Sequence, residues 1–68
     1  MKPLTAAEVE KLLREHGFRL DRSRGSHHVW IKDGWSRSIV VPYHGNKPLK
    51  QGLLIGIFND ACISKPQR

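Results

Sequence analysis

The stretch Arg24-Gly25-Ser26-His27-His28-Val29-Trp30 sets a turn-forming segment directly before a run of β-forming residues. Glycine and serine favour a tight turn, whereas valine and tryptophan are typical of strands. Two histidines stand at the junction, and histidine is the side chain that ordinarily titrates near neutral pH. Two interpretations of these histidines are therefore open: a proton-transfer site, or a pair of strand histidines without a chemical role. On this stretch alone the inert pair is favoured, because short motifs often match by chance.

A β-hairpin is predicted to follow. Residues 27–32 are rich in β-formers, Asp33-Gly34 favours a two-residue type I′ turn, and residues 35–43 predict the returning strand. This turn sets three cross-strand pairs: Lys32 with Trp35, Trp30 with Arg37, and His28 with Ile39. Adjacent strand residues point to opposite faces, so His27 and His28 are expected on different sides of the sheet. Neither face is cleanly apolar, which leaves open which one packs on the helices, and His27 is expected at the rim of the packed face.

An amphipathic helix is predicted before the central stretch. Thr5 and Glu8 have the spacing of a capping box, and apolar residues recur at helical spacing up to Gly17, a typical helix terminator. These signals predict a helix over residues 6–16. Residues 18–22 then alternate apolar and charged side chains, as a half-buried strand does.

A second helix is predicted after a loop at residues 44–48. It begins near Gly52, and its apolar residues follow helical spacing: Leu53, Leu54, Ile57, Phe58 and Ala61. Ile55 widens the apolar face, which favours a helix buried on most sides or one that also contacts a partner. Gly56 would allow another backbone to approach closely. Cys62 is expected to pack at the helix end.

The predicted order is helix, three strands, helix, in one domain spanning residues 1–68. It indicates an α+β fold in which a three-stranded antiparallel sheet carries both helices on one face. Double-stranded RNA-binding domains have this order of elements.

Composition favours an anionic partner. Twelve Lys and Arg residues against six Asp and Glu give a formal charge of +6 and a pI near 10.1. Simple solubility would also account for such a charge. The clustering of Arg19, Arg22 and Arg24 around the histidines favours a binding surface for nucleic acid or an acidic protein.

The sequence also indicates a compartment. A single cysteine, Cys62, excludes a disulfide within the chain, so a reducing cytoplasm is the simpler assumption. The N-terminal residues lack the apolar core of a signal peptide, and no apolar run is long enough to span a bilayer.

Several basic residues are candidates for binding RNA. Lys47 and Lys50 bracket the start of the second helix, where backbone amides favour an anion, and His44 lies in the same loop. Arg24 adjoins the histidines. Arg24, Lys47 and Lys50 are predicted to bind phosphates, and His44 is predicted to bind RNA.

A second RNA-binding group is predicted around the tryptophans. Lys32 and Arg37 lie near Trp30 and Trp35, so they could form a stacking and cation–π surface. Packing in the core is the alternative, and it is favoured for at least one tryptophan because so small a core needs large side chains.

RNA carries its own nucleophile, the 2′-hydroxyl, so a ribonuclease needs only proton transfer and phosphate stabilisation. His27 beside Arg24 and the amides of Gly25 and Ser26 would supply both. A zinc site of His27, His28, His44 and Cys62 is disfavoured, because no familiar ligand spacing is present.

Taken together, these residues resemble HicA-type toxins, the mRNA interferases of HicA–HicB toxin–antitoxin pairs. The resemblance runs from Glu8 to about Ser64. Four segments carry it: residues 12–18, residues 24–30, Val41-Pro42-Tyr43-His44, and residues 47–52 leading into the apolar helix.

The resemblance implies a fold like the double-stranded RNA-binding domain, sequence-tolerant cleavage of mRNA and neutralisation by a HicB antitoxin. It implies no cofactor or metal, and contact with DNA only through the antitoxin complex. The family's catalytic histidine maps to His27, and its motif glycine maps to Gly25. The chain departs from the family at Leu53, where threonine is common, and at Cys62, where glycine usually ends the helix.

Two other hypotheses remain beside the ribonuclease. One is a non-catalytic RNA-binding module with the same fold, and the other is a protein-interaction subunit. The ribonuclease hypothesis assigns catalysis to His27, with Gly25, Ser26 and His28 as supporting residues. It predicts 2′,3′-cyclic phosphate products, and it leaves open whether His28 and His44 assist.

Overall fold

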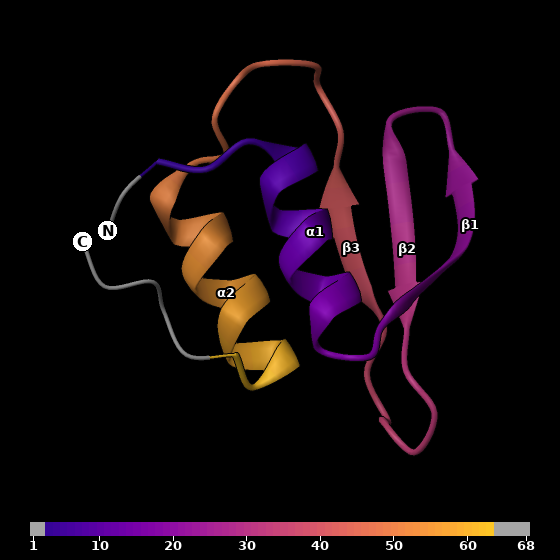
Figure 1. Ribbon diagram of the computed structural model, residues 1–68. Helices are drawn as coiled ribbons and strands as arrows, with labels where there is room; N and C mark the ends of the chain where they lie inside the picture. Colours follow the sequence, from indigo (N-terminus) through magenta and orange to yellow (C-terminus); the bar gives the residue numbers. More distant parts are fainter. Residues whose placement is uncertain (1–2, 64–68) are drawn as a thin grey trace.

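The computed structural model describes residues 3–63. Two helices and three strands follow one another in the order α1 (Ala6–Glu15), β1 (Arg19–Arg24), β2 (His27–Ile31), β3 (Ile39–Pro42) and α2 (Gln51–Ala61). The strands form an antiparallel sheet in the order β1-β2-β3, and both helices lie on one side of it (Figure 1). The predicted α+β arrangement is confirmed.

Helix α1 begins and ends on local signals. The Thr5 hydroxyl accepts from the Glu8 amide at 3.3 Å, and the Glu8 carboxylate accepts from the Thr5 amide at 2.8 Å, which confirms the capping box. At the other end Gly17 has φ +90°, and the amide of Phe18 donates to the Leu13 carbonyl at 3.0 Å. This is a Schellman ending, in which a residue of positive φ lets the chain satisfy the last carbonyls of the helix.

Helix α2 buries one face only. Leu54, Ile57, Phe58 and Ala61 are buried as predicted, whereas Leu53 and Ile55 are 38% and 36% exposed. Burial on most sides was therefore a wrong prediction. A Cβ added at Gly56 would meet no atom within 4 Å, so no backbone of the described chain approaches this glycine.

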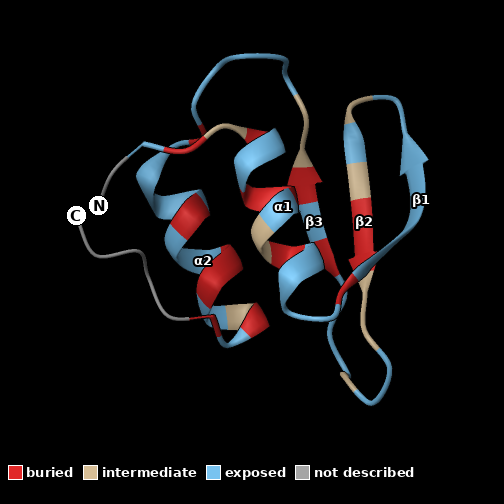
Figure 2. Cartoon of the chain, in the orientation of Figure 1, coloured by how far each residue is buried: buried red, intermediate tan, exposed pale blue. Residues whose placement is uncertain are grey.

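The β1–β2 hairpin is tighter than predicted. Arg24 pairs with His27 across a two-residue turn, Gly25-Ser26, so β1 runs through Arg24 instead of ending at residue 22. The predicted half-burial of this strand is also wrong. Every β1 residue is exposed, because β1 is an edge strand that lies beyond the cover of the helices (Figure 2).

The β2–β3 connection differs from the predicted hairpin. The Trp35 amide does donate to the Lys32 carbonyl at 3.0 Å across Asp33-Gly34. Type I′ is excluded, however, because it needs positive φ at both central positions and only Gly34 has it. The returning strand begins at Ile39, so the predicted strand over residues 35–43 was too long.

The predicted register was wrong by two residues. Trp30 pairs with Ile39 instead of Arg37, and His28 pairs with Val41 instead of Ile39. The physical reason lies in α2: the carbonyl of Asp60 accepts from the Trp35 indole at 2.9 Å. This contact holds the connection against the helix end and away from β2.

The core lies between the sheet and the helices. A shift of two residues preserves the alternation of faces, so Trp30, Ile39 and Val41 lie on one face and all are buried. They pack with α1 and α2, and Figure 2 shows buried residues on the facing sides of these elements. The question left open by the sequence is thereby answered: the face that carries His28 packs on the helices.

Candidate functional site

His27 is the first residue of β2 and lies on the outer face of the sheet, away from the helices. The register places Arg24 on one side of it and Pro42 on the other. His27 is exposed, so the expectation of a partly shielded position at the rim of the packed face is wrong. The prediction that His27 and His28 face opposite sides is confirmed, because His28 contacts α1.

An open groove begins beside His27. Its volume is about 310 Å³, and it is lined by Pro42, His44, Lys47, Pro48, Leu49, Lys50 and Leu53. Figure 1 shows why these residues meet: the β1–β2 turn, the loop after β3 and the start of α2 all lie at one end of the molecule. His44, Lys47 and Lys50 thus share one groove, and His27 lies at the same end of the molecule, paired with Pro42 at the edge of the groove.

The turn before His27 is fixed by its backbone. Gly25 has φ +56°, a conformation that favours glycine, and nothing would meet a Cβ added there. Glycine is therefore needed here for its conformation and not for space. The Ser26 carbonyl accepts from the Tyr43 amide at 2.6 Å, which joins this turn to the loop that carries His44.

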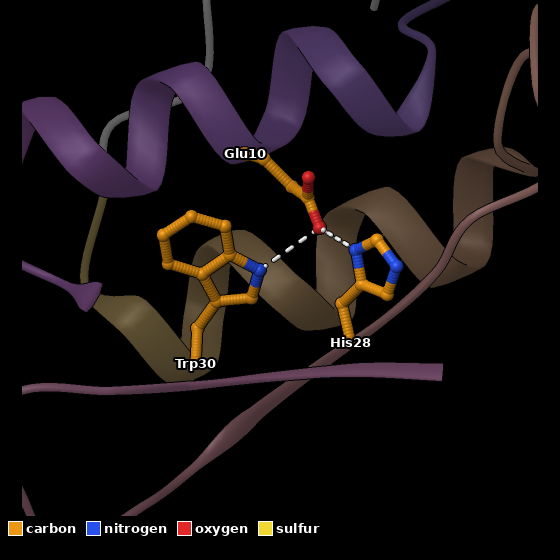
Figure 3. Close-up of polar contacts among 3 residues, drawn as sticks. All are labelled: Glu10, His28 and Trp30. Carbon is orange, nitrogen blue, oxygen red and sulfur yellow. Dashed lines mark hydrogen bonds and ion pairs between the residues drawn. The ribbon is translucent and has the colours of Figure 1, made fainter. Parts of the chain in front are cut away.

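A buried carboxylate holds His28. One oxygen of Glu10, Oε2, accepts from His28 Nδ1 at 2.7 Å and from the Trp30 indole at 2.9 Å (Figure 3). Glu10 is only 7% exposed. The ring of Tyr43 stacks on that of His28 with centroids 4.8 Å apart. His28 is therefore held between α1 and the loop after β3.

The hydrogen bond to Glu10 also bears on which ring nitrogen of His28 carries a proton. An ionised carboxylate only accepts hydrogen bonds, so the bond to Glu10 favours the His28 tautomer with a proton on Nδ1. A glutamate in an amphipathic helix is ordinarily assigned to the polar side, so the sequence did not single out Glu10. Glu10 follows Ala6 by four residues and precedes Leu13 by three. Residues at these spacings share a helix face, so the spacing would have placed Glu10 on the buried face.

Lys32 and Arg37 lie at the opposite end of the sheet from His27. The Lys32 ammonium lies 5.3 Å from the Phe18 ring centroid and 5.4 Å from that of Trp35. Arg37 forms an ion pair of 2.8 Å with Asp60. The structure does not bring these two residues to the His27 end, and their role in RNA binding stays a prediction.

Trp30 lies inside the core, and Trp35 lies at its edge. Trp30 is 1% exposed, which confirms that at least one tryptophan packs in the core. Trp35 is partly buried against the same core, edge-on to Phe18. Cys62, by contrast, is exposed, so its expected packing was wrong.

The remaining candidate sites are not assembled within residues 3–63. No three His, Cys, Asp or Glu side chains of this part come together in a way that would hold a metal ion. No helix there is long and apolar enough to cross a membrane.

A family model matches the part of the chain that carries all of these elements. The model of the HicA toxin of bacterial toxin–antitoxin systems matches residues 6–63. The chain belongs to the HicA toxin family. The match begins with the first residue of α1 and ends two residues after α2, so it includes every element of the fold. Membership makes this HicA protein a toxin that pairs with an antitoxin. A comparison with curated proteins found no match.

Proposed function

We propose that this HicA toxin is a metal-independent endoribonuclease that cleaves mRNA in the cytoplasm, with His27 as its catalytic histidine. One observation carries the proposal. His27 is exposed at the end of the sheet, between Arg24 and a groove that contains Lys47 and Lys50. A polyanion held by these cations has its phosphate beside an imidazole.

The reaction needs one proton removed and one supplied. His27 takes the proton from the 2′-hydroxyl, and the 2′-oxygen forms a bond to the adjacent phosphorus. The bond from phosphorus to the 5′-oxygen breaks, and the 5′-oxygen takes up the proton that His27 had accepted, which returns the imidazole to its starting state. The products are a 2′,3′-cyclic phosphate and a 5′-hydroxyl. Arg24 and the Gly25-Ser26 turn stabilise the charge that develops on the phosphorane oxygens.

The groove holds the RNA on the other side of His27. Lys47 and Lys50 are exposed, and Lys50 directly precedes α2. The first turn of a helix has backbone amides without an intrahelical acceptor, and its dipole favours an anion. His44 lines the same groove and adds a hydrogen-bonding group for sugar or phosphate.

The proposal is tested with His27→Ala and a matched histidine variant. His16→Ala serves as the control, because His16 is exposed and its Nδ1 lies 2.9 Å from the Leu12 carbonyl of its own helix. Purified proteins are incubated with a mixed-sequence RNA in the presence of a chelator. We expect His27→Ala to lose cleavage while it retains RNA binding, and His16→Ala to cleave like the wild type.

The products and the wild type decide between mechanisms. A 2′,3′-cyclic phosphate end supports attack by the 2′-hydroxyl, whereas 5′-phosphate ends that require a divalent metal would contradict it. A wild type that binds RNA but never cleaves it, even on long incubation, would show a non-catalytic RNA-binding module. RNA affinity without salt dependence would favour the protein-interaction subunit.

The antitoxin that we propose is of the HicB type. A HicB chain that covers His27 and the groove would abolish cleavage when the two proteins are mixed. An adjacent reading frame that encodes such a chain would identify the partner. Failure of the encoded protein to suppress cleavage would contradict this pairing.

A further inference from the structure

A β-bulge in β1 gathers three arginines on the outer face of the sheet. Arg24 pairs with His27 and Arg22 with Val29, but the register then shifts between Leu20 and Arg22, and Arg19 pairs with Ile31. Paired residues share a face, so Arg19, Arg22 and Arg24 all lie on the face of His27. Simple alternation from Arg24 would have sent Arg19 to the helix side.

These three arginines are accessible. The side chains of Arg19 and Arg22 are 61% and 63% exposed, and their ion pairs are with Asp33 and Asp21. Ion pairs at such exposure stabilise a protein by about 0–1 kcal/mol, so phosphates can compete for these guanidinium groups. Arg24 is exposed, and no carboxylate pairs with it among residues 3–63.

An apolar strip runs beside the arginines. On the outer face the other two strands contribute only His27, Val29, Ile31, Val40 and Pro42. Val40 is 45% exposed and Ile31 is half-buried, whereas Val29 is only 8% exposed. The surface thus has cations along one edge, uncharged side chains at its centre, and His27 at the end where Arg24 lies.

We propose that the outer face of the sheet is a track for single-stranded RNA, with the phosphates along Arg19, Arg22 and Arg24 and the sugars and bases over Ile31 and Val40. This inference rests on the proposed ribonuclease function and names the path by which its substrate reaches His27. Two strand residues advance roughly 6.6 Å, on the order of the distance between neighbouring phosphates. The row therefore matches the repeat of a nucleic acid strand.

Charge and direction favour RNA over an acidic protein segment on this face. The three arginines form a line that ends beside the proposed catalytic histidine, and the groove with Lys47 and Lys50 continues beyond it. A single strand laid along this line crosses His27. Unpaired bases suit the apolar strip, whereas a duplex would keep its bases away from it.

The test uses two double variants in a His27→Ala background, which prevents cleavage during binding. Arg19→Gln/Arg22→Gln removes two charges from the track and keeps Arg24, which the proposed reaction uses. Lys11→Gln/Arg14→Gln removes the same charge from exposed positions of α1. Fluorescence anisotropy measures the affinity for a labelled, unstructured 12-nucleotide RNA and for its duplex over a range of salt concentrations. Circular dichroism checks that both variants are folded.

We expect the track variant to bind the single strand roughly tenfold more weakly, with a salt slope lower by about 0.7 per arginine removed. The α1 variant should bind close to the parent. Equal affinities for the two variants would overturn the track, as would an equal loss for strand and duplex. A loss of antitoxin binding with RNA affinity unchanged would assign the face to a protein instead.

The outcome is separable from that of the proposed function. If the wild type cleaves RNA and the track variant binds normally, the track is wrong and the ribonuclease stands. If the wild type does not cleave and the track variant still loses affinity, the face binds RNA without an enzyme.

Discussion

The Glu10 carboxylate and the His28 imidazole are 2.7 Å apart, and they join α1 to β2 across the core. Removing a carboxylate from water is costly unless hydrogen bonds replace its hydration. Here His28 and Trp30 replace it, and both bonds reach the same oxygen. The pair therefore fixes how the helix sits on the sheet, immediately beside the residue proposed to carry catalysis.

Glu10→Ala is expected to destabilise the fold by about 1–3 kcal/mol, because the Trp30 indole would lose its acceptor in the interior. Glu10→Gln retains an acceptor oxygen and should cost less. Urea unfolding in the His27→Ala background measures both. Glu15→Ala is the control, since Glu15 is exposed on the same helix. An equal effect at the two positions would show that the buried bonds add nothing.

Substitution of the two neighbouring histidines should affect stability to different extents. His28→Ala leaves the Glu10 carboxylate buried with one donor, so we expect a loss of about 2 kcal/mol in unfolding free energy. His27→Ala removes an exposed side chain, and its stability should stay within about 0.5 kcal/mol of the wild type. Thermal unfolding checks this, because about 1 kcal/mol shifts Tm by roughly 4–8 °C in a domain of this size.

RNA cleavage by folded His28→Ala protein tests whether His28 has a role beyond stability. His28→Ala assayed well below its melting temperature should still cleave RNA if His28 is only a structural residue. Loss of cleavage in a folded His28→Ala protein would show that His28 also takes part in the reaction. Either result settles a role that the sequence left open.

Features set by neighbours in the chain were predictable. The Thr5–Glu8 capping box lies within one helical turn, and Gly17 ends α1 by its own backbone preference. The placement of Trp35 was not predictable, because it depends on a carbonyl 25 residues away. That contact moved the β2–β3 register by two residues. The bulge in β1 has no local sequence signal either, and it decides which arginines share the face of His27.

Some residues of the candidate site were likewise predictable from the sequence, and others were not. His27 and Gly25 were found from a short motif and a family resemblance. Glu10 was missed because a charged residue in an amphipathic helix is ordinarily assigned to the solvent side. Only the position of β2 under α1 shows that it faces two donors.

Cys62→Gly is expected to stabilise the protein by about 1 kcal/mol. Cys62 has φ 55°, and the amide of Ile63 donates to the Phe58 carbonyl at 2.9 Å. This is the same Schellman ending that Gly17 gives to α1. At positive φ the side chain of Cys62 is strained, whereas a glycine at that position would not be. Thermal unfolding measures the gain. Gly17→Ala is the reciprocal control and should lose stability; a gain there or a loss at Cys62→Gly would contradict the argument.

Gly56→Ala should also stabilise the fold, by up to about 1 kcal/mol, because glycine is a poor residue in a helix interior and a Cβ there meets no atom within 4 Å. The measurement is urea unfolding in the His27→Ala background. A loss of stability would mean that another part of the chain lies against this glycine. The same variant tests the exposed side of α2, which carries Leu53 and Ile55. If the antitoxin approaches that side closely, Gly56→Ala weakens the complex although the toxin alone becomes more stable.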